Sequence, residues 1–153
     1  MAMISAADAA KVQTYFAENL SGPVTIDLFT EKKSLLLVPG RRECEYCVET
    51  QVLLGEVADL SDKLSLAVHD VRNDPDAGMQ DGIAPNMVPA FVLNGANRGK
   101  VRHFGMPAGY EFSSLLQDLV DVSSGETGLS QATKDELATI QSDVHIRVFV
   151  TPT

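Results

Sequence analysis

The chain contains two cysteines, and they lie three positions apart in the segment Cys44-Glu45-Tyr46-Cys47. At this spacing on the first turn of a helix, the two sulfurs lie on one face and can bond without movement of the backbone. The ring that such a bond closes is very small, so a purely structural disulfide would stabilise the fold little, and the cytosol would keep it reduced. The spacing therefore favours thiol–disulfide exchange.

The two cysteines would have different roles in such an exchange. Cys44 would lie beside the unsatisfied N–H groups of the helix N-terminus, whose partial positive charge favours the thiolate, the species that attacks a disulfide. Cys47 would lie deeper, one turn into the helix. It would resolve a mixed disulfide formed at Cys44, because it is held beside that bond while a competing thiol has to diffuse to it.

Charged residues on both sides of Cys44 act on this thiolate in opposite directions. Arg42, the second of two adjacent arginines, would favour the thiolate, although its simplest interpretation is a solvated loop charge. Glu45, together with Glu43, would oppose the thiolate. Since the signs nearly cancel, we expect the pKa of Cys44 to be lowered only modestly, with Arg42 and Glu45 as the residues that modulate it.

Two other uses of the cysteine pair stay open. The pair would supply half of a zinc or iron–sulfur site, but the chain has no second paired motif, and His69, His103 and His145 would complete a site only in a dimer. We expect these histidines to lie on the surface or on strand faces, and we predict neither a metal nor another cofactor. In the remaining interpretation the cysteines are redox-inert.

Apolar residues recur at helical and at strand spacing in turn, and this periodicity predicts the elements around the cysteine pair. The predicted helices are 5–19, 45–60, a segment around 112–120, and 130–140, and the predicted strands are 24–30, 63–71, 90–94, 100–104 and 144–150, with 35–38 as a hairpin partner or a packed loop. The second predicted helix has Cys44 in its first turn. A βαβ unit followed by a β-hairpin and a covering helix predicts an α/β fold with a central mixed β-sheet flanked by helices.

Val88 and Pro89 stand directly before the most apolar predicted strand, 90–94. Proline cannot donate to a sheet ladder, so it is tolerated at the start of a strand or in a special turn. We predict a cis bond between Val88 and Pro89 that presents backbone to the cysteine sulfurs. An ordinary trans proline at a strand entrance is the alternative.

Asp27 lies inside the strand predicted over residues 24–30. A buried aspartate near a cysteine pair would serve as a proton carrier. The strand alternation, however, points Asp27 away from the apolar side chains of Val24, Ile26 and Leu28. We therefore expect Asp27 to face solvent.

The composition is that of an ordinary globular domain, with 153 residues of which 44% are hydrophobic and 22% are charged. The formal net charge of -9 repels nucleic acid phosphates and anionic lipid, so we expect neither nucleic-acid nor membrane binding. No apolar run approaches the roughly 18 residues of a membrane span, and the first residues lack the features of a leader peptide. We expect a cytoplasmic protein.

The cysteine motif and the Val88-Pro89 pair together resemble the active-site motif and the facing cis-proline of the thioredoxin superfamily. Segments 102–112 and 145–153 are similar to glutaredoxin-like protein disulfide oxidoreductases, which carry two thioredoxin-like units in tandem. The N-terminal domain of the flavoprotein component of alkyl hydroperoxide reductase is a more distant relative of similar layout. The resemblance implies a thioredoxin-like fold.

The same resemblance assigns the site residues and the domain organisation. It implies that Cys44 is the nucleophile and Cys47 the resolving thiol, and that Val88, Pro89 and Tyr46 contact the substrate. It also implies a thioredoxin-like domain over residues 1–142. Residues 143–153 then form a C-terminal strand that resembles the start of a missing second unit.

That C-terminal strand would carry apolar residues on one face and an aromatic side chain on the other. An unpaired apolar strand is a template for aggregation, so it needs a partner. We expect it either to dock on the chain's own sheet or to exchange with a second copy and form a homodimer.

The sequence thus predicts a thiol–disulfide oxidoreductase that exchanges disulfides with a protein or small-thiol partner through the Cys-Glu-Tyr-Cys motif. An electron-donor reductase would be a second partner. The alternative is a redox-inert, thioredoxin-like adaptor domain whose cysteines have no catalytic use. The reactivity of Cys44 as a function of pH separates the two hypotheses.

Overall fold

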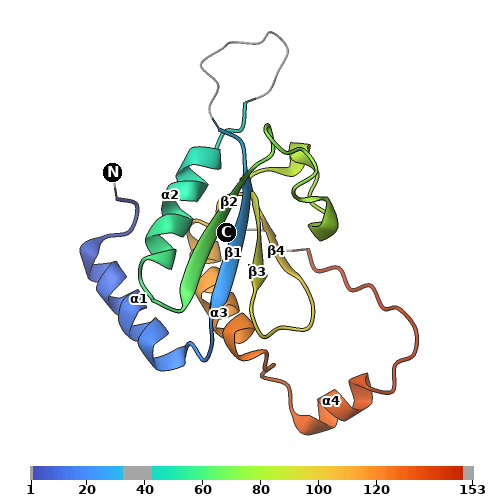
Figure 1. The fold of residues 1–153 in the computed structure, drawn as a ribbon. Coiled ribbons are helices and arrows are strands. Elements are labelled where there is room, and N and C mark those ends of the chain that lie inside the picture. The colour runs from blue at the N-terminus through green and yellow to red at the C-terminus, as the bar shows by residue number, and fades with distance from the viewer. Residues whose placement is uncertain (1, 33–42, 150–153) are drawn as a thin grey trace.

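In the computed structural model, residues 2–32 and 43–149 are described. They form a four-stranded sheet in the order β2-β1-β3-β4 (Figure 1). The central strand β1 (Val24–Thr30) pairs in parallel with β2 (Leu64–Asp70) and antiparallel with β3 (Ala90–Asn94), and β3 pairs antiparallel with β4 (Val101–Phe104). The predicted α/β fold with a central mixed sheet is confirmed. The predictions for residues 35–38 and for Arg42 lie outside the described residues.

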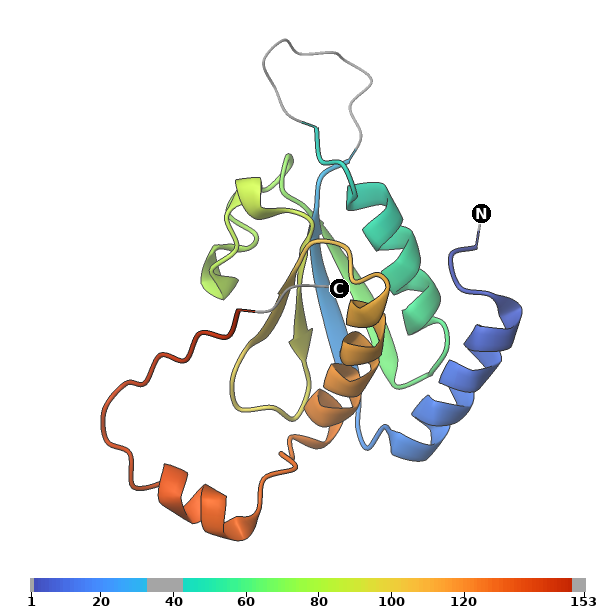
Figure 2. The ribbon, with the colours of Figure 1, turned by 180° about the vertical axis from the view of Figure 1, so that it is seen from behind.

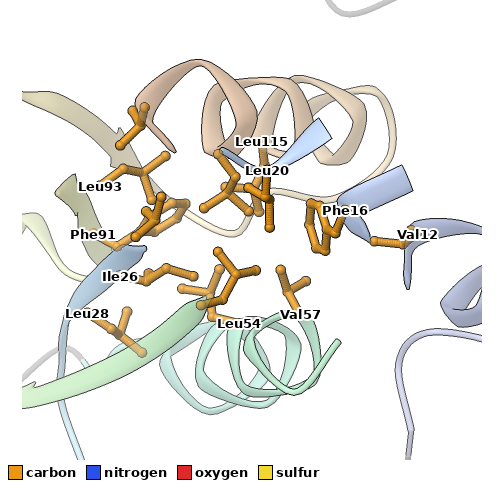
Figure 3. Packing of buried hydrophobic residues seen from close by; sticks show 14 residues of the cluster. Val12, Phe16, Leu20, Ile26, Leu28, Leu54, Val57, Phe91, Leu93 and Leu115 are labelled. Atoms are coloured by element: carbon orange, nitrogen blue, oxygen red, sulfur yellow. The ribbon is translucent and has the colours of Figure 1, made fainter. Parts of the chain in front are cut away.

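Three helices pack against one face of this sheet: α1 (Ala6–Asn19), α2 (Cys47–Ala58) and α3 (Tyr110–Ser124) (Figures 1 and 2). Their apolar stripes meet the inward side chains of β1 and β3 in one core, which Figure 3 shows from close by. The largest side chains that are fully buried in this core are Phe16, Phe91, Ile26, Leu28, Leu54, Leu93, Leu115 and Leu119. This core holds α2, and with it the cysteine pair, against the sheet.

The connection between β2 and β3 covers one end of the opposite face of the sheet (Figure 1). This connection contains two short 3-10 helices, η1 (Met79–Asp81) and η2 (Pro85–Met87). A second apolar cluster lies beneath it, made of Phe29, Val71, Ile83, Ala90 and Val92. The connection therefore seals the end of the sheet at which β1 finishes and β3 begins.

α1 begins one residue after the start of the helix predicted over residues 5–19. Ser5 is the N-cap, and its hydroxyl accepts a hydrogen bond from the backbone N–H of Asp8 at 3.1 Å. The helix predicted near the C-terminus is shorter than expected and is observed as α4 (Gln131–Leu137), with Ser130 as its N-cap. None of the helices in the described part of the chain is long and apolar enough to cross a membrane.

The helix predicted over residues 45–60 begins later, at Cys47, so Cys44 does not lie in its first turn. The carbonyl oxygen of Tyr46 accepts the first intrahelical bond, from the Thr50 N–H at 2.9 Å, which makes Tyr46 the N-cap. Residues 43, 45 and 46 are exposed, whereas the buried apolar positions of the segment begin at Cys47. Without an apolar side chain to bury, the residues before Cys47 gain nothing from a helical turn.

The strand predicted over residues 144–150 is not formed in the part that the structure describes, residues 144–149. Val144, Ile146, Val148 and Phe149 are 61%, 80%, 79% and 88% exposed. A strand is defined by pairing, and none of the backbone in residues 2–32 and 43–149 pairs with this segment. The division into residues 1–142 and 143–153, and the homodimer through this segment, stay predictions.

Asp27 points away from the helical core, as its place in the alternation predicts, but it is not simply solvated. Its side chain is 23% exposed. One carboxylate oxygen lies 2.9 Å from Nε2 of His69, and the other accepts a hydrogen bond from the Asn94 amide at 2.7 Å. The aspartate joins three strands across the outer face of the sheet.

Candidate active site

Cys44 and Cys47 form a disulfide, with their Cα atoms 5.6 Å apart. Cys47 is the first residue of α2 and is 1% exposed, whereas Cys44 lies in the preceding loop and is half-buried. Cys44 is therefore the more accessible of the two cysteines. The roles of Cys44 as the attacking cysteine and of Cys47 as the resolving cysteine stay predictions.

The buried cysteine is positioned by the carboxyl end of β1. The backbone N–H of Glu31 donates to Sγ of Cys47 at 3.2 Å, and the hydroxyl of Thr30 donates to the carbonyl oxygen of Cys47 at 3.4 Å. Thr30 is itself 1% exposed. An N–H donor aimed at the sulfur also favours negative charge there once the disulfide is reduced.

The predicted cis bond between Val88 and Pro89 is present. The antiparallel register pairs Phe29 with Ala90, so Pro89 lies at the same end of the sheet as Thr30, which holds Cys47. The carbonyl oxygen of Pro89 accepts a hydrogen bond from the Gly105 N–H at 2.8 Å. The sheet thus brings the start of α2 and the cis-proline to one end, while direct contact of Val88, Pro89 or Tyr46 with a substrate stays a prediction.

A small cleft of about 140 Å³ opens beside the half-buried Cys44. It is lined by Glu31, Lys32, Glu43, Cys44, Glu45, Val48, Glu49 and Arg72. Glu45, which the sequence predicts to modulate the pKa of Cys44, does line this cleft. Arg42, the other predicted modulator, lies outside the described residues.

Arg72 is a charged residue of this cleft that the sequence analysis missed. Its Nε donates to the Glu31 carboxylate at 2.5 Å, and the two side chains are 18% and 11% exposed. The parallel pairing of β1 with β2 carries the signal that identifies it. Because Thr30 pairs with Asp70, the residues just beyond both strands lie side by side at the active-site end.

Tyr46 lies inside the motif and is 49% exposed. The negative charge of Glu45 raises the pKa of the Tyr46 phenol above its ordinary value, and a hydrogen bond to the Glu45 carboxylate acts in the same direction. The side chains between the two cysteines therefore create a locally negative surface, which disfavours a further anion at this point.

Two of the three histidines, His69 in β2 and His103 in β4, lie on the sheet, whereas His145 is exposed in the segment after α4. His69 pairs with Asp27 and stacks on Phe29, with ring centroids 5.0 Å apart. His103 stacks on Phe91 and lies 3.0 Å from the Asp118 carboxylate, without the angle of a hydrogen bond. Over residues 2–32 and 43–149, no group of three or more histidine, cysteine, aspartate and glutamate side chains could hold a metal ion.

No known family model and no curated protein matches the chain. Solved structures do match it. A protein disulfide oxidoreductase from Aeropyrum pernix K1 aligns with a TM-score of 0.71 and 26% sequence identity over 88% of this chain and 54% of its own. A mutant form of the alkylhydroperoxide reductase AhpF from Enterococcus faecalis (V583) aligns with a TM-score of 0.70 and 22% identity over 89% of this chain and 60% of its own.

The NTD_N/C domain of AhpF from Enterococcus faecalis also aligns, with a TM-score of 0.67 and 21% identity over 88% of this chain and 59% of that one. The chain thus spans between 54% and 60% of the length of these three structures. Most of this chain is included in each alignment. The chain therefore has a thioredoxin-like fold.

Proposed function

We propose that the chain is a thiol–disulfide oxidoreductase that exchanges disulfides with a protein or small-thiol partner through Cys44 and Cys47. The observation that supports this most directly is the disulfide between a half-buried cysteine and a fully buried one at the start of α2. The similarity to a protein disulfide oxidoreductase supports the same activity.

The exchange proceeds in two steps. The Cys44 thiolate bonds to one sulfur of a substrate disulfide, and the other substrate sulfur leaves with the electron pair of the broken bond and takes a proton. Cys47 then loses its proton and bonds to Cys44, which releases the first substrate sulfur as a thiol. Two electrons pass from the cysteine pair to the substrate, and the reverse sequence oxidises a substrate dithiol.

The partners follow from this chemistry. The oxidised pair needs a dithiol, a small thiol such as glutathione, or an electron-donor reductase to return to the reduced state. We place this activity in the cytoplasm, where thiol reductants are abundant and cysteine pairs serve in redox exchange more than in structure.

Trapping variants test the proposal. Cys44→Ser should abolish the exchange, whereas Cys47→Ser should accumulate a mixed disulfide on Cys44 when it is incubated with an oxidised protein substrate, as read by mass spectrometry. Equal trapping by both variants would overturn the assigned roles.

The equilibrium of the wild-type pair in a glutathione redox buffer tests the activity as such. Rapid equilibration between reduced and oxidised forms supports an oxidoreductase. If the reduced protein exchanges no faster than an ordinary cysteine in an unfolded peptide, the chain is an adaptor domain instead.

A further inference from the structure

Arg72 is a half-buried cation in the cleft beside Cys44. The two steps of the proposed exchange assign no role to its positive charge. It lies two residues beyond the end of β2, and its side chain is 18% exposed. Its backbone N–H donates to the Asp70 carboxylate at 3.1 Å, which fixes the turn after the strand. The side chain is therefore directed into the cleft by the strand that carries it.

Arg72 is held there by Glu31. The two residues follow adjacent parallel strands, and the pairing continues past the strand ends, because the Val71 N–H donates to the Thr30 carbonyl at 3.0 Å. Arg72 Nε donates to the Glu31 carboxylate, and the Glu31 N–H donates to Sγ of Cys47. A short run of contacts thus links the guanidinium to the disulfide.

The charges that line the cleft differ in their burial. Among the described residues these charges are Glu31, Lys32, Glu43, Glu45, Glu49 and Arg72. Lys32, Glu43, Glu45 and Glu49 are exposed, so water and salt screen their effect on a sulfur in the cleft. Arg72 and Glu31 are screened least. The guanidinium also has N–H donors besides Nε, which a thiolate can accept from.

We propose that Arg72 is a positioning residue of the redox centre, and that its guanidinium favours the thiolate form of Cys44 once the disulfide is reduced. Reduction adds two electrons and breaks the Cys44–Cys47 bond. Cys47 takes a proton, and Cys44 keeps its negative charge in the cleft that the guanidinium also lines. The importance of Arg72 for catalysis rests on the proposed function. The Cys44 thiolate, however, forms whenever the disulfide is chemically reduced, without any substrate.

The test uses the full chain in a Cys47→Ser background, in which Cys44 is the only thiol. The rate of alkylation of Cys44 by iodoacetamide is measured against pH, since only the thiolate reacts. Arg72→Gln should raise the midpoint pH by about one unit, because an opposite charge near an ionised group shifts its pKa by about that much or more. Arg72→Lys should restore most of the shift.

Glu31→Gln separates charge from structure. It breaks the same ion pair from the other side, keeps an oxygen acceptor for Arg72 Nε, and removes the charge that partly neutralises the guanidinium. The midpoint pH should therefore fall. If the Arg72–Glu31 ion pair only held the structure together, Arg72→Gln and Glu31→Gln would shift the midpoint pH in the same direction. Such a result would overturn the proposal. The measurement on Glu31→Gln still tests the proposal if Arg72→Gln fails to fold, as judged by circular dichroism.

Lys32→Gln is the matched control, because it removes an equal charge from an exposed side chain of the same cleft. Its midpoint pH should stay close to that of the parent. An equal shift in Lys32→Gln and Arg72→Gln, or no shift in Arg72→Gln, would overturn the proposal.

A second readout uses both cysteines. The glutathione equilibrium constants of wild type and Arg72→Gln should differ by up to tenfold at a pH above the pKa of Cys44 in both proteins. Well below these pKa values the two constants should be equal, because the positive charge of Arg72 stabilises only the thiolate. A ratio independent of pH would contradict the proposal. Alkylation needs no exchange with a substrate, so it tests Arg72 even if the chain proves to be no oxidoreductase.

Discussion

The backbone N–H of Glu31 and the sulfur of Cys47 are 3.2 Å apart and hydrogen-bonded, although the two residues are separated by 16 positions in the sequence. This bond joins the end of the central strand to the start of α2. The buried sulfur is therefore located by the sheet, and the loop that carries Cys44 only has to present the second sulfur beside it.

The raised pKa of Tyr46 predicts a measurable titration next to the motif. Its phenol should ionise at a higher pH than a free tyrosine, and Glu45→Gln should lower that pH, because it removes the negative charge that raises the pKa most and leaves the hydroxyl only a neutral acceptor. Absorbance of the phenolate measures the titration, with Tyr46→Phe to assign the signal among the three tyrosines. Glu49→Gln is the control, since the charge of Glu49 contributes least. An unchanged titration in Glu45→Gln would contradict this electrostatic description of the motif.

The N-terminus of α1 predicts an acid-sensitive cap. The hydrogen bond from the Ser5 hydroxyl, and then Lys11, lower the pKa of Asp8 below its ordinary value. A lowered pKa in the folded state means that the stabilisation is present above the unfolded pKa and is lost as the pH falls through the folded value. Ser5→Ala should raise the pKa of Asp8, as followed by NMR titration of its carboxyl carbon. If the pKa is the same in both proteins, the cap does not act on Asp8.

Gly125 closes α3 in a left-handed conformation, with φ of 67°, and a Cβ there would lie 2.5 Å from the carbonyl oxygen of Ala96. Gly125→Ala should destabilise the protein by more than about 2 kcal/mol, because backbone strain and a steric clash with backbone act together. Chemical denaturation measures the change. Gly128→Ala is the matched control, since a Cβ at residue 128 meets nothing within 4 Å. Equal stability of the two variants would refute the clash.

Removal of residues 143–153 tests the predicted role of the exposed apolar segment. We expect a change in oligomeric state or solubility, because Ile146, Val148 and Phe149 are 80%, 79% and 88% exposed. A second copy of the chain that packs on this segment would cover these apolar side chains. Light scattering of the full and shortened chains measures the mass of each. The same mass, stability and solubility in both would show that the segment makes no contact that matters.

The sequence predicts an element correctly where packing in the fold also satisfies its apolar periodicity. It does not predict whether a segment finds a neighbouring strand to pair with. Ser5 and the alternation of Ile26 and Leu28 carry local signals that the core then satisfies, so α1 and β1 begin and end close to where the sequence places them. The segment 144–149 has the same alternation, but a strand also needs a neighbouring backbone, which no local pattern specifies.

The candidate site divides in the same way. The spacing of Cys44 and Cys47 and the cis bond before Pro89 follow from residue types, and both were predicted. Arg72 enters the site only through the parallel register of β1 and β2, because it lies far from the motif in sequence. Charge contributed across a sheet depends on that register, which the sequence pattern alone leaves open.

The unequal burial of the two sulfurs also bears on damage by peroxide. In the reduced protein we expect an oxidant to reach Cys44 first and convert it to a sulfenic acid, since Cys47 is 1% exposed in the disulfide form. Cys47, which the Glu31 N–H holds at the start of α2, then condenses with that sulfenic acid and expels water. The product is the disulfide that a thiol can reduce again, so the pair is diverted from the irreversible sulfinic and sulfonic acids.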